Sequence, residues 1–245
     1  MEEVSDRFII LKAVDTGETN KRLSLFCKNL GKITAIGRGT RSKNAKLKFL
    51  NLPFCVCEGV LFKTGTNTYL VKTARVMHSF SCITQNINKF KAGSIVLEAL
   101  LKFYNFPNNV FDNAVEALEY IEASETNEQL FALKFLLELI YNNFNLNLSC
   151  CNACGTVVAG GGVNTPKKVF INFSTGELRC ASCTEINFRQ IKHSTCEFVE
   201  TIKKLSYPAL ATINCDAATL KSVFKFVGEL IKGLTDIDFS SIKKL

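Results

Sequence analysis

Residues 15–54 read DTGETNKRLSLFCKNLGKITAIGRGTRSKNAKLKFLNLPF. Turn-forming Gly, Asn and Asp divide this stretch into short apolar runs, which is typical of consecutive β-strands. The candidate strands in and around it are FIILKAV (8–14), LSLF (23–26), KITAIG (32–37), FCVCEGVLF (54–62) and YLVKTARVM (69–77). The last two are joined by the turn TGTN and resemble a hairpin. Short strands this close together predict a small barrel or sandwich rather than α/β units.

Positive charge is concentrated in the same region. The chain carries a net charge of +8. No Asp or Glu occurs from Thr19 to Cys57, and the nine basic residues there are Lys21, Arg22, Lys28, Lys32, Arg38, Arg41, Lys43, Lys46 and Lys48. A local excess of one sign attracts polyanions to one place on the surface. The pattern therefore indicates contact with a nucleic acid or an anionic membrane surface.

The composition is that of a globular protein. Of its 245 residues, 47% are hydrophobic and 21% are charged. No stretch reaches the roughly 18 apolar residues of a membrane-spanning helix, and the N-terminal MEEVSDRF is acidic where a secretion signal would be basic. We therefore expect a cytoplasmic protein. Its 11 cysteines are then poor candidates for disulfides, and clustered ones suggest a metal site.

The hydrophobic period changes after the candidate strands. From Ile83 to Tyr141, and again at about 196–205 and 218–234, apolar residues recur at helical spacing. The predicted fold is α+β, with a β-barrel followed by an α-helical domain into which a cysteine module is inserted. The predicted divisions are 1–80 for the barrel, 81–149 for the first helical part, 150–190 for the module and 191–245 for the second helical part.

Two C-x-x-C pairs define the module. Cys151 and Cys154 are followed, after twenty-five residues, by Cys180 and Cys183. Each pair places two thiolates on one tight turn, and two pairs complete a tetrahedral S4 site, which predicts one structural Zn²⁺ per chain. Cys150 and His193 are weaker alternative ligands. The remaining cysteines are expected to be buried small hydrophobic residues: Cys27, Cys55, Cys57, Cys82, Cys196 and Cys215.

No catalytic constellation is visible in the sequence. It lacks a P-loop, G-x-S-x-G and H-E-x-x-H, and its two histidines are His78 and His193. A site with four thiolates leaves zinc no open coordination position for water or substrate. We therefore expect a binding protein and not an enzyme.

These motifs resemble the RecO family of bacterial recombination mediators. The resemblance lies in the G-E-x-x-x-x-L element of residues 17–23, the G-K-I of 31–33, the basic glycine-containing loop, the Pro-Phe of 53–54, and CNACG with CASC. The order of barrel, helices and four-cysteine module also agrees. Thr40 and Ser42 within the loop and the long spacer between the cysteine pairs are departures.

The resemblance implies an OB-fold barrel that binds single- and double-stranded DNA, anneals strands and helps load a recombinase onto DNA coated by single-strand-binding protein. It also implies two protein partners, RecR and the acidic C-terminal tail of single-strand-binding protein. Within an OB fold a Lys/Arg loop beside the open face would track phosphates. The expected DNA contacts are Lys32, Arg38, Arg41, Lys43, Lys46 and Lys48.

Further expectations concern aromatic residues and the partner surface. Phe49, Phe54 and Phe62 are expected in the barrel core, while Tyr69 is open between core and base stacking. The basic residues expected to contribute to binding an acidic tail are Lys203, Lys204, Lys221 and Lys225. Two alternatives remain: a non-enzymatic protein-interaction adaptor with a zinc module, and a zinc-ribbon factor that binds RNA.

Overall fold

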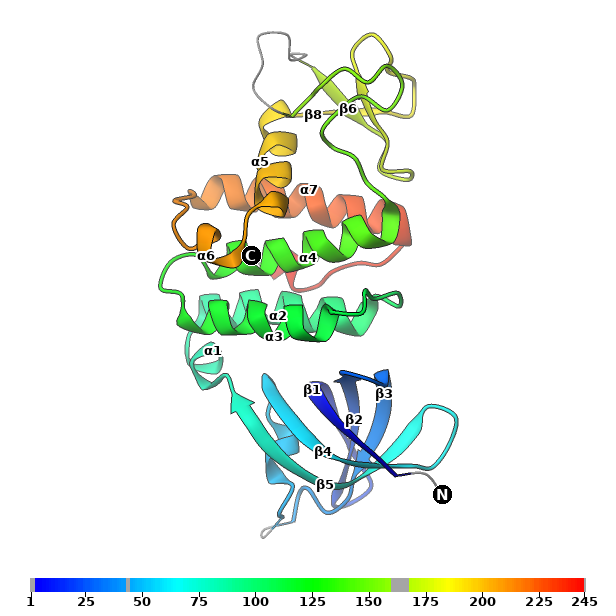
Figure 1. The fold of residues 1–245 in the computed structure, drawn as a ribbon, viewed down its shortest axis with the longest axis vertical. Coiled ribbons are helices and arrows are strands. Elements are labelled where there is room, and N and C mark those ends of the chain that lie inside the picture. Colours follow the sequence, from blue (N-terminus) through cyan, green and yellow to red (C-terminus); the bar gives the residue numbers. More distant parts are fainter. Residues whose placement is uncertain (1–2, 43–44, 160–167, 245) are drawn as a thin grey trace. The chain divides into compact units, whose positions relative to one another are not determined.

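A computed structural model describes residues 3–42, 45–159 and 168–244. It divides into two compact units: residues 1–103 with 108–123, and residues 104–107 with 124–245. The first unit contains the strands β1 to β5 and the helices α1 to α3, and the second contains the remaining elements (Figure 1). The α+β class and the order of strands, helices and cysteine module agree with the prediction.

Five strands form a closed barrel in the order β1-β2-β3-β5-β4. They are β1 (Glu3–Thr16), β2 (Asn20–Cys27), β3 (Gly31–Gly37), β4 (Cys55–Lys63) and β5 (Thr68–Ser79). β4 pairs antiparallel with β1 and closes the ring, and β3 pairs in parallel with β5. A five-stranded barrel agrees with the OB fold that the resemblance implies.

The barrel core follows the two-residue period of its strands. Phe8 and Ile10 of β1, Leu23 and Leu25 of β2, and Ile33 of β3 are all at most 2% exposed. Alternate residues of a strand point to opposite faces, so these side chains meet inside the ring. Burial of this set fixes the strand register, because a shift of one residue would turn the apolar side chains to solvent.

Three helices complete the first unit: α1 (Ser81–Gln85), α2 (Ile87–Lys102) and α3 (Val110–Ala123). The side-chain oxygen of Asn86 accepts hydrogen bonds from the backbone N–H groups of Asn88 and Lys89 and caps α2. Gly93 of α2 lies against Phe54, so close that a Cβ at this glycine would be 2.8 Å from the ring. The glycine therefore permits close packing of α2 on the barrel.

The second unit packs helices beside a small sheet. Its helices are α4 (Glu128–Phe144), α5 (His193–Lys204), α6 (Tyr207–Leu210) and α7 (Ala217–Thr235), followed by the 3-10 turn η2 (Ile242–Lys244). Its sheet has the order β7-β6-β8, from β6 (Val169–Ile171), β7 (Leu178–Cys180) and β8 (Arg189–Ile191). Within the described residues, no helix is long and apolar enough to cross a membrane.

Candidate nucleic-acid interface and metal centre

The basic loop that follows β3 is tied to the turn between β1 and β2. The side-chain oxygen of Asn20 accepts a hydrogen bond from the backbone N–H of Gly39 at 2.9 Å, and the Arg41 N–H donates to the carbonyl of Thr19 at 3.1 Å. Gly39 has φ +62, a left-handed conformation that glycine adopts without strain. The loop backbone therefore has fixed partners on the neighbouring turn.

A buried threonine anchors the same loop from inside. Thr40 is 0% exposed, and its carbonyl accepts a hydrogen bond from the Asn51 side chain at 3.2 Å. Its methyl group lies against Gly37, where an added Cβ would come within 2.8 Å. Thr40 departs from the family pattern in the sequence, but here it is buried and holds the loop, while Arg38 and Arg41 are exposed.

Four of the six predicted DNA contacts are exposed on or after this loop: Arg38, Arg41, Lys46 and Lys48. Lys43 lies outside the described residues. Asp15, on the neighbouring strand β1, forms ion pairs with Arg41 at 3.4 Å and with Lys21 at 3.2 Å. The loop has no acid near it in sequence, but this carboxylate is near it in space. The β1–β2 register, which pairs Asp15 with Lys21, is the signal that would have found it.

Lys32 lies apart from these side chains and has a different set of partners. Its ammonium group donates to the carbonyls of Leu101 and Phe103 at 2.7 and 2.9 Å, at the C-terminal end of α2. Burial lowers the pKa of this lysine. A cation at a helix C-terminus is stabilised by the helix dipole, so the geometry gives Lys32 a role in holding α2 to the barrel.

The aromatic residues mostly belong to the barrel core. Phe54 and Tyr69 are 2% and 5% exposed, and Phe49 packs against the core. Phe62 is partly buried. Tyr69, which the sequence left open, is therefore a core residue in this structure and not an exposed stacking platform.

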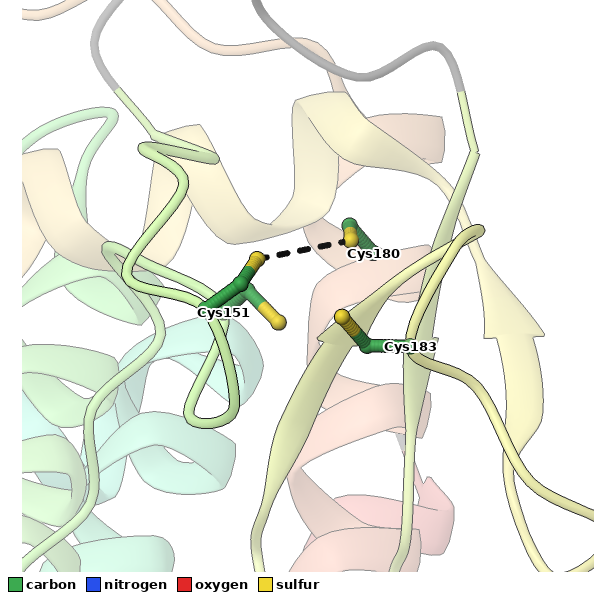
Figure 2. Close-up of side chains that lie close together, drawn as sticks. Cys151, Cys180 and Cys183 are labelled. Carbon is green, nitrogen blue, oxygen red and sulfur yellow. Dashed lines mark hydrogen bonds between the residues drawn. The ribbon is translucent and has the colours of Figure 1, made fainter.

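The four cysteines of the two C-x-x-C pairs meet in the second unit. Cys151, Cys154, Cys180 and Cys183 place their Sγ atoms within 4.8 Å of one another. The Sγ atoms of Cys154 and Cys180 are 3.8 Å apart. Tetrahedral zinc with Zn–S bonds of about 2.3 Å separates its sulfur ligands by about 3.8 Å, so the donor set fits this ion. Figure 2 shows the sulfurs of Cys151, Cys180 and Cys183 turned toward a common centre.

Backbone turns and one asparagine position the two pairs. The Gly155 N–H donates to the carbonyl of Cys151 at 2.9 Å, and Gly155 has φ +72, as a chain that curls back beneath the thiolates requires. Asn152 is paired with Leu178 through two hydrogen bonds, at 2.8 Å to its carbonyl and at 2.7 Å from its N–H. Leu178 begins β7, which ends at Cys180, so Asn152 sets the distance between the pairs. No motif in the sequence marks Asn152, because its role depends on pairing with Leu178.

The thiols of the cluster share protons unequally. The hydroxyl of Thr156 lies 3.1 Å from the Cys154 Sγ and lowers the pKa of this thiol to about 6. A hydrogen bond with Cys154 is the largest cause that raises the pKa of Cys183, to about 12. Such a group of close, hydrogen-bonded thiols is chemically suited to a soft or borderline cation that binds thiolates.

The other candidate ligands point elsewhere. His193 contacts the carbonyl of Val158 through Nε2 and the carboxylate of Glu197 through Nδ1 at 3.4 Å. Cys150 accepts a hydrogen bond from Asn147 at 3.0 Å and is not part of the cluster.

The expectation that all remaining cysteines are buried is wrong for two of them. Cys27, Cys55, Cys57 and Cys196 are buried as expected, whereas Cys82 is exposed and Cys215 is partly exposed. Cys82 lies in the short helix α1, in which Ile83 and not Cys82 is the buried apolar residue.

A groove of about 410 Å³ runs along α7 in the second unit. Its apolar side chains include Phe224, Phe239 and Ile242, and its rim carries Lys221, Lys225, Lys232 and Lys243. The two acids that line it are already paired, Asp238 with Lys243 and Glu229 with Arg189. Of the four lysines expected to bind an acidic tail, Lys221 and Lys225 line this groove, while Lys203 stacks on Tyr141 at 3.9 Å and Lys204 lies outside.

Fold and site together define a class: a small β-barrel with an exposed, anchored basic loop, joined to helices that carry a four-thiol cluster able to hold a metal ion. The chain matches the family models described as Recombination protein O N terminal, over residues 1–80, and Recombination protein O C terminal, over residues 85–241. It therefore belongs to the RecO family of DNA repair and recombination proteins, as the sequence motifs indicate.

Curated relatives cover most of the chain at low identity. The DNA repair protein RecO of Caldanaerobacter subterraneus subsp. tengcongensis is 23% identical over 241 residues, which cover 95% of this chain and 93% of the relative. RecO of Caldicellulosiruptor saccharolyticus is 26% identical over 231 residues, covering 92% and 90%. RecO of Clostridium perfringens is 28% identical over 150 residues, covering 60% and 61%.

Proposed function

We propose that the chain is a non-enzymatic recombination mediator that binds single- and double-stranded DNA through its barrel, anneals strands and helps to load a recombinase onto DNA coated by single-strand-binding protein. The observation that carries the DNA contact is the anchored loop: its backbone is held by Asn20, Thr19 and Asn51, while Arg38 and Arg41 remain exposed. Guanidinium groups suit phosphates because they donate two parallel hydrogen bonds. A fixed loop presents them with little loss of conformational entropy.

Arg38 and Arg41 differ in how freely their guanidinium groups can contact a phosphate. Arg38 forms no ion pair within the described residues, whereas Arg41 is held by Asp15 at 3.4 Å. Asp15 also contacts Lys21, so its charge is shared between two cations. A phosphate that approaches Arg41 competes with a half-exposed carboxylate, and exposed ion pairs of this kind contribute little to stability. Arg38 is therefore the stronger of the two proposed contacts, and Lys43, Lys46 and Lys48 are the further contacts proposed from the sequence.

The test is the double variant Arg38→Gln/Arg41→Gln, with binding to single- and double-stranded oligonucleotides measured by fluorescence anisotropy at several salt concentrations. Each lost phosphate contact lowers the magnitude of the log–log salt slope by about 0.7 for single strands and about 0.9 for duplex. Binding of both and annealing should weaken, with thermal stability unchanged. Lys12→Gln, an exposed lysine on β1 outside the loop, is the control. Wild-type affinity and slope in the double variant would place the DNA site elsewhere.

We propose that the cluster of Cys151, Cys154, Cys180 and Cys183 holds one structural Zn²⁺. When bound, the ion links the two cysteine pairs and stabilises the fold around β6 and β7. Four thiolates leave no coordination position for a substrate, which supports a role in folding and not in catalysis.

The partners implied by the family are RecR and the tail of single-strand-binding protein. The groove along α7 favours the tail: Lys221, Lys225 and Lys232 form no ion pair within the described residues, and they surround apolar side chains. An acidic peptide with an apolar end is complementary to this surface in charge and hydrophobicity.

Charge reversal tests the groove. Lys221→Glu/Lys225→Glu should weaken an acidic tail peptide about tenfold or more, since two attractive contacts become repulsive. Lys12→Glu/Lys204→Glu makes the same change in net charge outside the groove and should have little effect. Equal affinities in the two double variants would remove the groove from the proposal.

Replacement of DNA by RNA in the oligonucleotide titrations separates a DNA-binding mediator from the alternative of an RNA-binding factor.

A further inference from the structure

A second polar pocket lies at the start of α5, in the unit that carries the cysteine cluster. It has a volume of about 170 Å³. Its polar lining comes from β8, α5 and α7 and includes Arg189, Lys192, Thr195, Ser222, Lys225 and Glu229. The cysteines of the metal cluster do not line this pocket.

The N-terminus of α5 is open to an anion. Lys192 occupies the N-cap position, its side chain forms no capping hydrogen bond, and the first turn contains no acid. The Thr195 N–H donates to the Lys192 carbonyl at 3.0 Å, and the helix dipole places a partial positive charge at this end, which favours anion binding. His193 is turned away, toward Val158 and Glu197.

A largely buried threonine in this turn has a hydroxyl without a protein partner among the described residues. Thr195 lines the pocket, is only 8% exposed, and its Oγ1 takes part in no hydrogen bond within the described residues. Two other helix threonines behave differently: Thr201 and Thr235 donate to the carbonyls of Glu197 and Ile231, each at 2.7 Å. The free Oγ1 belongs to a largely buried residue that lines the pocket, so it can donate to a ligand with an acceptor atom that enters there.

The charges around the pocket specify the ligand. Glu229 is paired with Arg189, while Lys192 and Lys225 form no ion pair within the part of the chain that the structure describes. Two ammonium groups, two hydroxyls from Thr195 and Ser222, and a helix N-terminus are all able to donate. A phosphate group, with several strong acceptor oxygens, satisfies more of these donors than a carboxylate does.

The size and the aromatic wall favour a phosphate within a strand. The volume is below the roughly 300–1,000 Å³ of small-molecule sites, so a whole free nucleotide is not enclosed. Phe173 lines the pocket, is partly exposed, and carries the Arg189 guanidinium 4.5 Å above its ring. A nucleotide next to the bound phosphate would find this aromatic and cationic surface, which suits single strands.

We propose that this pocket at the N-terminus of α5 binds one backbone phosphate of a single-stranded nucleic acid and is a second strand-contact site, separate in residues from the barrel loop. The nature of the ligand rests on the proposed nucleic-acid function. Two contact sites on one chain would allow it to hold two segments of strand, which annealing requires.

The test uses the full chain and two kinds of variant. Thr195→Val removes a neutral donor and should weaken binding of an oligo-dT about two- to tenfold without changing the salt slope. Lys192→Gln removes a charge and should lower the magnitude of the slope by about 0.7. Thr201→Val and Lys204→Gln are matched controls on the same helix, and both should bind as the wild type does. If the pocket variants bind oligo-dT like their controls, the proposal is overturned.

Amide chemical shifts show where the ligand lies. In the Arg38→Gln/Arg41→Gln background, oligo-dT should shift the amides of Ser194 and Thr195, and Thr195→Val should abolish the shift. A shift with inorganic phosphate but none with oligo-dT would overturn the assignment to a strand. If the loop variant binds as tightly as the wild type while the α5 variants weaken binding, the barrel proposal fails and this one stands. If instead the loop variant weakens binding while the α5 variants bind as the wild type does, the barrel proposal stands and the α5 proposal fails.

Discussion

The side-chain oxygen of Asn20 accepts a hydrogen bond from the backbone N–H of Gly39 at 2.9 Å, and this contact joins the first turn of the barrel to its basic loop. Because Asn20 is uncharged, its effect on DNA binding can act through loop geometry and not through charge. Asn20→Ala should weaken oligonucleotide binding about two- to fivefold with the salt slope unchanged, since a fixed loop loses less entropy on binding.

Asn214→Ala is the matched control, because Asn214 is exposed in the second unit. Both variants can be compared by anisotropy titration, with circular dichroism to check folding. Unchanged affinity in folded Asn20→Ala would show that loop anchoring does not contribute to binding.

Lys32 and Lys48 are both predicted DNA contacts, but the structure separates their environments. The Lys32 ammonium donates to two carbonyls at the end of α2, whereas Lys48 is exposed. Lys32→Gln should therefore lower the free energy of unfolding by about 1 kcal/mol or more and leave the salt slope nearly unchanged. Lys48→Gln should leave the free energy of unfolding nearly unchanged and lower the magnitude of the salt slope. Chemical denaturation and salt titration of both variants measure the difference, and a reduced slope without loss of stability in Lys32→Gln would restore its role in DNA contact.

The strands, the helices and the four-cysteine cluster could be predicted because each depends on local pattern. Two-residue alternation marks β2 and β3, and the spacing of Cys151, Cys154, Cys180 and Cys183 brings four thiols together in the structure. Residues whose role depends on a distant partner could not be found in this way. Lys32 is one of nine similar basic residues in sequence, and its contact with α2 is sixty-nine residues away. Asn152 likewise depends on pairing with Leu178, which follows the long spacer.

The buried thiols should be inert at neutral pH. Burial is the main cause that raises the pKa of Cys57 from 9.0 to about 12, and it does the same for Cys196. Since the thiolate is the reactive form, iodoacetamide at pH 8 should modify exposed Cys82 and leave Cys57 and Cys196 unmodified. Peptide mapping by mass spectrometry measures each site. Modification of Cys57 as fast as Cys82 in the folded protein would contradict the closed barrel core.

The thiols of Cys57 and Cys196 also determine whether the fold gains or loses stability at alkaline pH. Their pKa is higher in the folded protein than the ordinary 9.0, so the folded state retains protons that the unfolded state releases. Their contribution to stability is complete below pH 9 and is lost as the pH rises toward about 12. The denaturant concentration at the midpoint of unfolding should therefore decrease as the pH rises from 9 to about 12. Cys57→Ala should reduce this dependence, and an unchanged pH profile would show that Cys57 does not contribute to it.

Metal content is the most direct measure of the cysteine cluster. The four Sγ atoms lie within 4.8 Å of one another, so loss of two ligands leaves a site that cannot complete a tetrahedron. Cys151→Ser/Cys154→Ser should reduce the zinc content from about one ion per chain to nearly none, and should destabilise the module around β6 and β7, because binding free energy of a structural zinc is also folding free energy. Cys82→Ser is the matched control, since it removes an exposed thiol outside the cluster and should retain the metal. Elemental analysis and thermal denaturation of the two variants, with and without a chelator, give both quantities. Full zinc content in the double variant would mean that other residues hold the ion, and equal stability of the wild type before and after chelation would remove the structural role.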